Sequence, residues 1–456
     1  MNRIYRLVFN HATGQTQVAS ELTSTHVSPA GVSGSPRRRT ALAAALLTAL
    51  ASASASTTAL AQSYPYDADE SITGTVEHLG GFTVGANSPV VLDIIAGGIL
   101  RGGTEVSLGT NAGGTGTLNV STASSELDVF GASMYVGLRG TGALNVTDGG
   151  KANVDGVVSL GHQASGRGTV TVRGNGSQLT AGAIDVGVQG DSTMNITNGG
   201  KVVTTGALGG YGLRIGGQGT NDADLTTAVN VTSGGNLEVQ VGNLVIGQSG
   251  LATLTVGDSG VASVAGNILV GTGGFGTLAV DAGGTVTTQG ALVLGVATNS
   301  SGQLTISGAG ASLTADSMQV SADGSSIVTV QNGGQLTVTN ALNSETGSGQ
   351  SSNIRVTGAN SKITASSFTG TSVSIETGAS LVTDSGRIKD SKLTLPTGTP
   401  LPALRMFGAG TTWKNANALR IEANAEVTGG ARLTEGAFAN GHFVQPTVFA
   451  DVKDEM

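Results

Sequence analysis

The chain has 456 residues, of which 74 are glycine, 38% are hydrophobic and only 11% are charged, and cysteine is absent. The glycines do not recur at every third residue, so a collagen fold is excluded. The composition is apolar and poor in charge, unlike that of a disordered chain. From Gln62 onward, 17 basic residues stand against 29 acidic ones, a net charge of −12 that argues against nucleic-acid binding.

The first 24 residues, MNRIYRLVFNHATGQTQVASELTS, carry a specific pattern. The positions that carry it are Asn2, Ile4, Tyr5, Arg6, Phe9, Asn10, Thr13, Gly14, Val18, Ser20 and Glu21. This pattern resembles the extended signal peptide region of Gram-negative type V secretion. The resemblance implies a device that slows inner-membrane export and keeps large autotransporters from misfolding in the periplasm. It concerns the export route and not the activity of the cargo.

Residues 25–61 predict a secretory signal peptide. Three arginines, Arg37 to Arg39, precede the apolar run TALAAALLTAL, which is too short for a transmembrane helix of about 20 apolar residues. Small residues follow and end in Ala59-Leu60-Ala61, an A-x-A pattern directly before Gln62. We therefore expect cleavage after Ala61, and an uncleaved membrane anchor is the alternative interpretation.

An apolar-x-apolar motif then recurs through the middle of the chain. Its occurrences begin at Leu118, Leu144, Val170, Met194, Val229, Leu254, Leu278, Leu304 and Val328. Successive starts lie 26, 26, 24, 35, 25, 24, 26 and 24 residues apart. A second marker, an aliphatic residue followed by glycine, keeps the same phase, from Leu108-Gly109 to Leu294-Gly295. Two markers locked in phase indicate a true repeat.

Each unit of about 25 residues is predicted to form three short strands with glycine corners. In residues 143–161 the strands are ALNV, KANVDG and VVSLG, and TDGG is the turn after the first strand. The sequence therefore predicts an all-β fold, a right-handed parallel β-helix (β-solenoid) of roughly 10–12 coils over 106–420, with an N-terminal cap at 62–105. One coil cannot bury enough apolar surface to offset its ordering entropy, so each coil depends on its neighbours. The 35-residue unit should project an extra loop, GGQGTNDADLTT.

A variant corner alternates with the first. It reads GNGSQLT from Gly174, GAGASLT from Gly308, GANSKIT from Gly358 and GAGTTWK from Gly408. Units of both kinds, over about 105–420, resemble the passenger repeats of classical autotransporters. The resemblance implies a passenger exported through the periplasm to the outer membrane or cell surface, with the Sec translocon and the outer-membrane assembly machinery as its partners in export.

Two stretches imitate catalytic or cofactor motifs. VGDSGV at 256–261 contains the Gly-Asp-Ser-Gly of serine proteases, but it occupies the corner position of the repeat, and no histidine lies in a protease-like context. GTGGFG at 271–276 satisfies the dinucleotide pattern but lies at another corner rather than between a strand and a helix. We expect both to be coil corners, and we expect no catalytic residue and no cofactor.

Metal binding has one weak candidate. GGTGTLNV at 113–120 imitates a calcium-binding nonapeptide, but Leu118 replaces the aspartate ligand. Asn221, Asp222 and Asp224 in the long loop supply oxygen ligands that suit calcium, although three are too few alone. A solvated loop is the alternative.

The polar residue between the two apolar ones forms a column of Asn and Thr at 119, 145, 171, 195, 230, 255, 305 and 329. Strand side chains alternate, so this column faces away from the core. Two interpretations stay open, a stacked polar ladder on a solvated face and a ligand-binding face.

Residues 421–456 differ in character, since Phe438, Phe443 and Phe449 are three of the nine phenylalanines. This tail resembles one hairpin late in an autotransporter barrel, and one hairpin cannot close a barrel. We expect either a truncated gene product or a translocator on another chain, and favour truncation.

Together these features predict a secreted passenger that acts as a structural adhesin or autoaggregation factor, not an enzyme. Its expected partners are a host surface, matrix or neighbouring cells, with no nucleic acid and no small-molecule substrate. Two alternatives remain: an exported enzyme on the same scaffold, of polysaccharide lyase or protease type, and a two-partner-secreted exoprotein.

Overall fold

The computed structural model describes residues 5–10, 15–20, 63–217, 226–345, 351–389, 403–422 and 427–429. Contacts divide the chain into two units, 1–58 and 59–456. In the first unit, β1 (Tyr5–Asn10) and β2 (Gln15–Ser20) pair as an antiparallel hairpin. The described residues of the second unit form strands and connecting turns. Within the described ranges, no helix is long and apolar enough to cross a membrane.

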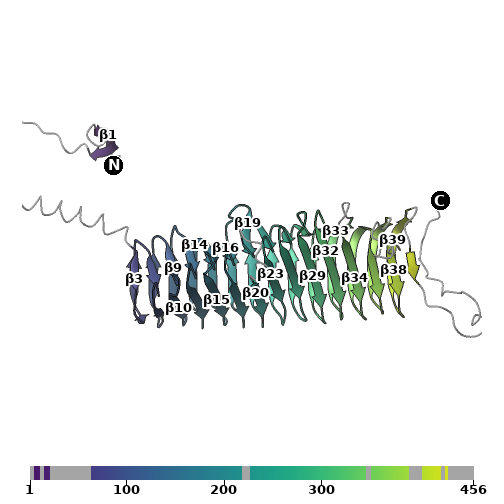
Figure 1. Ribbon diagram of the computed structural model, residues 1–456, viewed down its shortest axis with the longest axis horizontal. Helices are drawn as coiled ribbons and strands as arrows, with labels where there is room; N and C mark the ends of the chain where they lie inside the picture. The colour runs from purple at the N-terminus through teal and green to yellow at the C-terminus, as the bar shows by residue number, and fades with distance from the viewer. Residues whose placement is uncertain are drawn as a thin grey trace, which may run out of the picture. The chain divides into compact units, whose positions relative to one another are not determined.

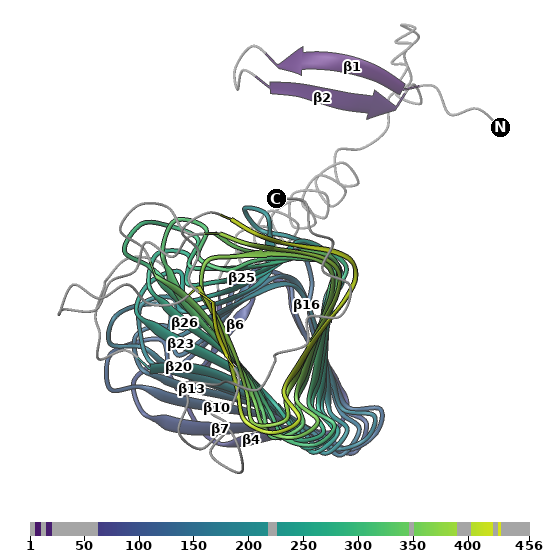
Figure 2. The same ribbon diagram turned by 90° about the vertical axis from the view of Figure 1, so that its right-hand side faces the viewer.

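The second unit is a parallel β-solenoid in which the successive coils stack in chain order along a rod (Figure 1). Figure 2, which looks along the rod, shows that each coil has three sides. Side 1 is a sheet of fifteen strands in chain order. These strands are β4 (Glu70–Ile72), β7 (Pro89–Ile94), β10 (Thr115–Ser121), β13 (Thr141–Thr147), β15 (Arg167–Arg173), β17 (Ser192–Thr197), β20 (Thr226–Thr232), β23 (Leu251–Val256), β26 (Phe275–Val280), β29 (Ser301–Ser307), β32 (Ser325–Gln331), β34 (Ser352–Thr357), β36 (Val373–Glu376), β38 (Leu404–Phe407) and β40 (Val427–Gly429).

Sides 2 and 3 are joined into one sheet because six long strands run across the corner between them. Side 2 alone holds β5 (Thr75–His78), β8 (Ile99–Gly102), β11 (Glu126–Val129), β18 (Lys201–Thr204), β21 (Asn236–Val239), β24 (Val261–Val264), β27 (Thr285–Thr288) and β30 (Ser312–Ala315). Side 3 alone holds β3 (Tyr64–Tyr66), β6 (Phe82–Val84), β9 (Val106–Leu108), β12 (Met134–Val136), β19 (Tyr211–Ile215), β22 (Asn243–Ile246), β25 (Ile268–Val270), β28 (Ala291–Leu294) and β31 (Ser317–Gln319). The strands shared by both are β14 (Lys151–Leu160), β16 (Gln178–Val186), β33 (Gln335–Ser344), β35 (Lys362–Gly370), β37 (Ser380–Ile388) and β39 (Thr412–Ile421).

The predicted parallel β-solenoid is confirmed. Two strands of side 1 precede β10 and one follows β38, so twelve of the fifteen lie within 106–420, in agreement with the predicted 10–12 coils. Strands β3 to β8, in the segment expected to be a cap, pair in parallel with the coils that follow them. The right-handed sense and the domain boundaries stay predictions, the former favoured by the usual hand of parallel crossovers.

The core is a set of aliphatic columns along the inside of the rod. Strand alternation sends every second side chain inward, and the repeat brings equivalent residues into register. Leu92, Leu118, Leu144 and Val170 follow one another on adjacent strands of side 1, and each is 0% exposed. Since the inside of one coil is covered by the next, the apolar residues of a coil are buried only in the stack.

The glycine corners are needed for close stacking. In the turn after β13, Asp148 and Gly149 have positive φ angles of 53° and 89°. A Cβ on Gly150 would lie 2.3 Å from the backbone oxygen of Val120 in the preceding coil, so only glycine fits there. The serine of the variant corner has a related role, because the N–H of Gly149 donates to the hydroxyl of Ser177 in the next coil at 3.0 Å.

The first coil is closed by an aromatic cluster. The rings of Tyr64 and His78 stack with centroids 4.3 Å apart, and the hydroxyl of Tyr66 hydrogen-bonds Nε2 of His78 at 2.7 Å. Tyr66 and Phe82 meet edge to face at 5.8 Å. Pro65 in β3 has no N–H to offer to another strand, and this reduces the tendency of an edge strand to pair with a further chain.

The buried columns give a first prediction. Leu278→Ala, which creates a cavity at a 0% exposed position, should lower the free energy of unfolding by about 2–5 kcal/mol. Thr277→Ala, at the neighbouring outward position of the same strand, should change it by less than about 0.5 kcal/mol. Chemical denaturation followed by circular dichroism measures both, and equal losses would contradict the assignment of inner and outer faces.

Candidate interaction surface

Two parts of the Asn and Thr column on the outside of side 1 form a hydrogen-bonded ladder. Nδ2 of Asn119 donates to Oδ1 of Asp93 at 2.7 Å, and Nδ2 of Asn145 donates to Oδ1 of Asn119 at 2.8 Å. Further along, Nδ2 of Asn230 donates to Oδ1 of Asn195 at 2.9 Å. Of the two interpretations that the sequence left open, the stacked ladder is therefore present, and it ties adjacent coils together through their outer faces.

Five central strands of side 1, β20, β23, β26, β29 and β32, form a surface that we call the central panel. Its described outward side chains are Ala228, Asn230, Thr232, Leu251, Thr253, Thr255, Phe275, Thr277, Ala279, Ser301, Gln303, Thr305, Ser307, Ser325, Ile327, Thr329 and Gln331. None of them carries a charge. Three are large apolar side chains that lie open to solvent, Leu251 at 40%, Phe275 at 57% and Ile327 at 52% exposure.

Two of the three apolar side chains are direct neighbours, and the third lies further along the same face. Leu251 and Phe275 are register partners on adjacent strands, and Ile327 is two strands beyond Phe275 and two positions further along its strand. Single exposed apolar residues are common, but several together on a flat, uncharged surface are typical of a surface that contacts another molecule.

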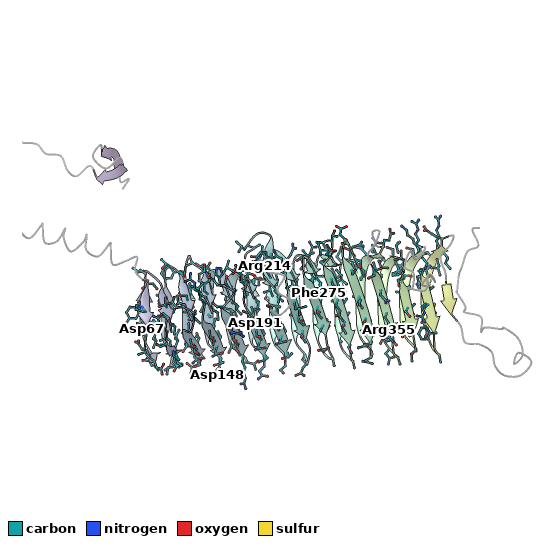
Figure 3. The ribbon with its side chains drawn as sticks, viewed as in Figure 1. Asp67, Asp148, Asp191, Arg214, Phe275 and Arg355 are labelled. Atoms are coloured by element: carbon teal, nitrogen blue, oxygen red, sulfur yellow. The ribbon has the colours of Figure 1, made fainter. Side chains whose placement is uncertain are left out.

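Charged pairs border the central panel at both ends. Toward the N-terminus, Nη1 of Arg167 lies 3.2 Å from Oδ2 of Asp191. Toward the C-terminus, Nη2 of Arg355 lies 2.8 Å from Oε2 of Glu376. Figure 3 places Phe275 between Asp191 and Arg355 along the rod. The panel therefore has an apolar centre and a charged border, the arrangement usual in protein interfaces.

The pair at the C-terminal border stays ionised over a wide pH range. Burial alone would raise the pKa of Glu376, but hydrogen bonds from Arg355 and Ser374 outweigh it and lower that pKa. Next to this pair, the guanidinium of Arg405 lies over the ring of Phe407, 5.4 Å from its centroid, at an exposed position of β38.

Charge is also uneven along the whole rod. Residues 226–345 contain six acidic residues and no lysine, arginine or histidine. Residues 346–422 contain eight basic and four acidic residues. The acidic and basic parts are thus separate coils of one solenoid.

A second polar feature lies on side 3, where the 35-residue coil is. Nε of Arg214 donates to Oδ1 of Asp185 at 2.7 Å, its Nη2 contacts Oδ2, and its Nη1 donates to Gln248 at 3.1 Å. Arg214 and Asp185 are 4% and 5% exposed, although both lie at outward strand positions. Burial and the charge of Asp185 raise the pKa of Tyr211 to about 12, and its protonated hydroxyl donates to Asp185 at 3.3 Å.

This ion pair forms one edge of a groove. The groove has a volume of about 620 Å³ and is lined by Tyr211, Arg214, Asn243, Gln248 and Leu269 among others. The connection before β19 turns back on itself, since the backbones of Leu208 and Tyr211 bond each other. Sequence reasoning missed the pair, yet a signal was present: both residues stand directly before an aliphatic-glycine marker, Val186-Gly187 and Ile215-Gly216.

The motifs singled out in the sequence lie as follows. Asp258 and Ser259, with φ of 47° and 63°, form the corner between β23 and β24, and the hydroxyl of Ser233 donates to Asp258 at 2.8 Å. Gly271, with φ of 72°, belongs to the corner between β25 and β26. Among the described residues, no group of three or more histidines and acids could hold a metal ion. The loop residues Asn221, Asp222 and Asp224, and the cleavage residues Ala59, Ala61 and Gln62, lie outside the described ranges, as does most of 421–456.

Comparison with known proteins identifies the export signal. The model of the extended signal peptide of the type V secretion system matches residues 1–55. The chain therefore carries a type V secretion signal, which indicates export. Its body is a β-solenoid typical of an autotransporter passenger, and the signal directs it through the Sec and outer-membrane export machinery to the outer membrane or cell surface.

One similar protein is an uncharacterized lipoprotein, YdeK, of Escherichia coli strain K12. It is 34% identical over 193 residues, which cover 40% of this chain and 14% of that protein. The chain thus spans about one seventh of the length of this relative. No solved structure matches the chain.

The buried ion pair gives a second prediction. Arg214→Met leaves the carboxylate of Asp185 buried without its cation, so the free energy of unfolding should fall by about 3–5 kcal/mol. Adding Asp185→Leu removes the uncompensated charge and should recover most of the loss. Arg167→Met, in an exposed pair, should cost at most about 1 kcal/mol. If denaturation shows that the double variant is no more stable than Arg214→Met, the uncompensated charge of Asp185 is not the cause of the lost stability.

Proposed function

We propose that the exported chain is a structural contact factor, an adhesin or autoaggregation factor, that works without catalysis. The observation that supports this most directly is the central panel, an uncharged flat surface with Leu251, Phe275 and Ile327 exposed. Exposed apolar side chains are unfavourable in water, and a partner that covers them gains about 25 cal/mol per Å² of apolar surface buried.

The solenoid also suits weak, distributed contact. Side 1 repeats similar outward residues on strand after strand at a spacing of about 4.8 Å, so one partner meets many equivalent positions. Several weak contacts held on one rigid body act together, because each contact after the first is intramolecular. This arrangement fits a host surface, a matrix or a neighbouring cell as the partner.

The groove beside Arg214 favours one other candidate, an exported enzyme on the same scaffold. A polysaccharide lyase or protease needs a free acid, base or nucleophile there. Beside the groove, however, the carboxylate of Asp185 and the guanidinium of Arg214 are bonded to each other, and the hydroxyl of Tyr211 donates a hydrogen bond to Asp185. These contacts support a structural role for the pair, and we therefore favour the contact factor.

The third prediction tests this proposal in the native host. Deleting the gene should reduce cell settling or attachment to matrix-coated surfaces, and restoring the wild-type gene should recover it. A gene that encodes the triple variant Leu251→Ser, Phe275→Ser and Ile327→Ser should restore settling or attachment only in part, because the panel loses its apolar centre. The matched control, Val261→Ser, changes an exposed apolar residue of side 2 and should behave as wild type.

Surface amounts of each variant, measured with an antibody on intact cells, must be equal for the comparison. If deletion changes neither settling nor attachment, the contact function is wrong. If the purified chain cleaves polysaccharides or peptides and loses that activity on Asp185→Asn, the enzyme is the better account.

A further inference from the structure

We propose that the groove beside Arg214 on side 3 binds a neutral oligosaccharide. This site goes beyond the proposed contact function, because it lies on a different side of the rod from the central panel and does not need the panel. Three observations carry the proposal: the extent of the groove, the order of apolar and polar groups across it, and the pairing of the one charged residue among its described lining residues.

The groove extends over three neighbouring coils. Its lining residues come from β19, β22 and β25 and from the connections next to them. Its volume of about 620 Å³ lies within the range of sites for small ligands, about 300–1,000 Å³. Gly209 and Gly210, in the turn before β19, line it with backbone alone. Three strands about 4.8 Å apart give room for more than one sugar ring.

The floor of the groove is apolar. Arg214, Val245 and Leu269 are register partners on adjacent strands, at positions that face outward. Val245 is only 8% exposed despite its outward position, so it lies low between its neighbours. The outward row continues along the rod with Val293, the register partner of Leu269. These aliphatic side chains fit the C–H groups on the face of a sugar ring, and each buried CH₂ group favours binding.

Polar groups lie at both ends of this floor. Asn243, at the start of β22, is the register partner of Tyr211. Gln248, Ser249 and Thr272 lie in the corners after β22 and β25. Sugar rings carry their hydroxyls around the edge, so an oligosaccharide on the floor presents hydroxyls to both sets. A purely apolar ligand would displace water from these polar groups without replacing its hydrogen bonds.

The two carboxamides of the groove are held through their oxygens. Oδ1 of Asn243 accepts from the backbone N–H of Asn267 at 2.9 Å, and Oε1 of Gln248 accepts from Nη1 of Arg214 at 3.1 Å. The amide nitrogen is therefore the end of each side chain that donates to a ligand oxygen. Side chains already held in place lose less freedom on binding. Arg214 is thus a positioning residue for Gln248.

The charges around the groove favour an uncharged ligand. Arg214 is the one charged residue among the described lining residues, and its Nε donates to Oδ1 of Asp185 at 2.7 Å. Residues 226–345, which supply β22 and β25, contain six acidic residues and no basic one. An acidic sugar would bring a further negative charge next to Asp185, and like charges disfavour that contact. The geometry therefore selects neutral sugars over sialylated, sulfated or uronic ones.

Titration of the purified exported chain with defined glycans tests the ligand class. The neutral probes are maltohexaose, cellohexaose, chitohexaose and mannohexaose, and the anionic probes are hexagalacturonate and a heparin hexasaccharide. We expect at least one neutral probe to bind with a dissociation constant below about 1 mM. The anionic probes should bind at least about tenfold more weakly. Absence of binding by every neutral probe, or tighter binding of an anionic one, overturns the proposal.

Two substitutions test the place of binding. Gln248→Glu keeps an oxygen for Arg214 but removes the amide donor, so the dissociation constant should rise about fivefold. Leu269→Ser removes apolar floor and should raise it about tenfold. The matched control for the first is Gln163→Glu, in a corner away from the groove, where Oε1 likewise accepts from an arginine. The control for the second is Val261→Ser, on side 2.

Both controls should bind the probe as wild type does, and circular dichroism checks that every variant keeps its sheet content. Unchanged affinity in both groove variants shows that the groove is not the site. A loss in the controls as large as in the groove variants likewise overturns the proposal.

Failure of this inference differs from failure of the proposed function. If no neutral probe binds while gene deletion still reduces settling or attachment, the groove proposal alone is refuted. If a neutral probe binds the groove while deletion changes neither settling nor attachment, the contact function is refuted and the groove remains a glycan site.

Discussion

Every other feature of this molecule depends on the parallel stacking of coils in register. A coil has too few apolar side chains to cover its own interior, and its strands have backbone groups on both edges that need partners. The next coil supplies both, since equivalent residues such as Leu254 and Leu278 lie directly against each other and are 0% exposed. The geometry of the outer faces follows, because the same register that aligns the core also aligns the outward columns.

The stacking was predictable from the sequence because it depends on a local period. The apolar-x-apolar motif and the aliphatic-glycine marker fix two of the three sides, and the glycine corners divide the strands between them. The GDSG and GxGxxG stretches could be assigned to corners for the same reason, since their phase matched Asp148-Gly149-Gly150 and its equivalents.

The surfaces were less accessible to sequence reasoning. An outward leucine at 251 or phenylalanine at 275 looks like any strand residue until the structure shows that the outward side chains of the adjacent strands are uncharged. Asp185 and Arg214 are 29 residues apart, and only the folded structure shows that they lie opposite each other on adjacent strands as a buried pair. The ladder of Asn119 and Asn145 needed side-chain geometry to be distinguished from a ligand face.

If stacking in register stabilises the fold, a whole coil can be removed without loss of folding, because its two neighbours can then stack on each other. The most direct measurement is the unfolding of a chain that lacks residues 251–274, which joins Gly250 to Phe275 at the position that Leu251 holds. We predict that this chain is folded, rich in sheet and cooperative in denaturation. Removal of the half-coil 251–262 should instead prevent folding, because the coils on either side can no longer stack in register. Loss of folding to the same extent in both deletions would contradict the account.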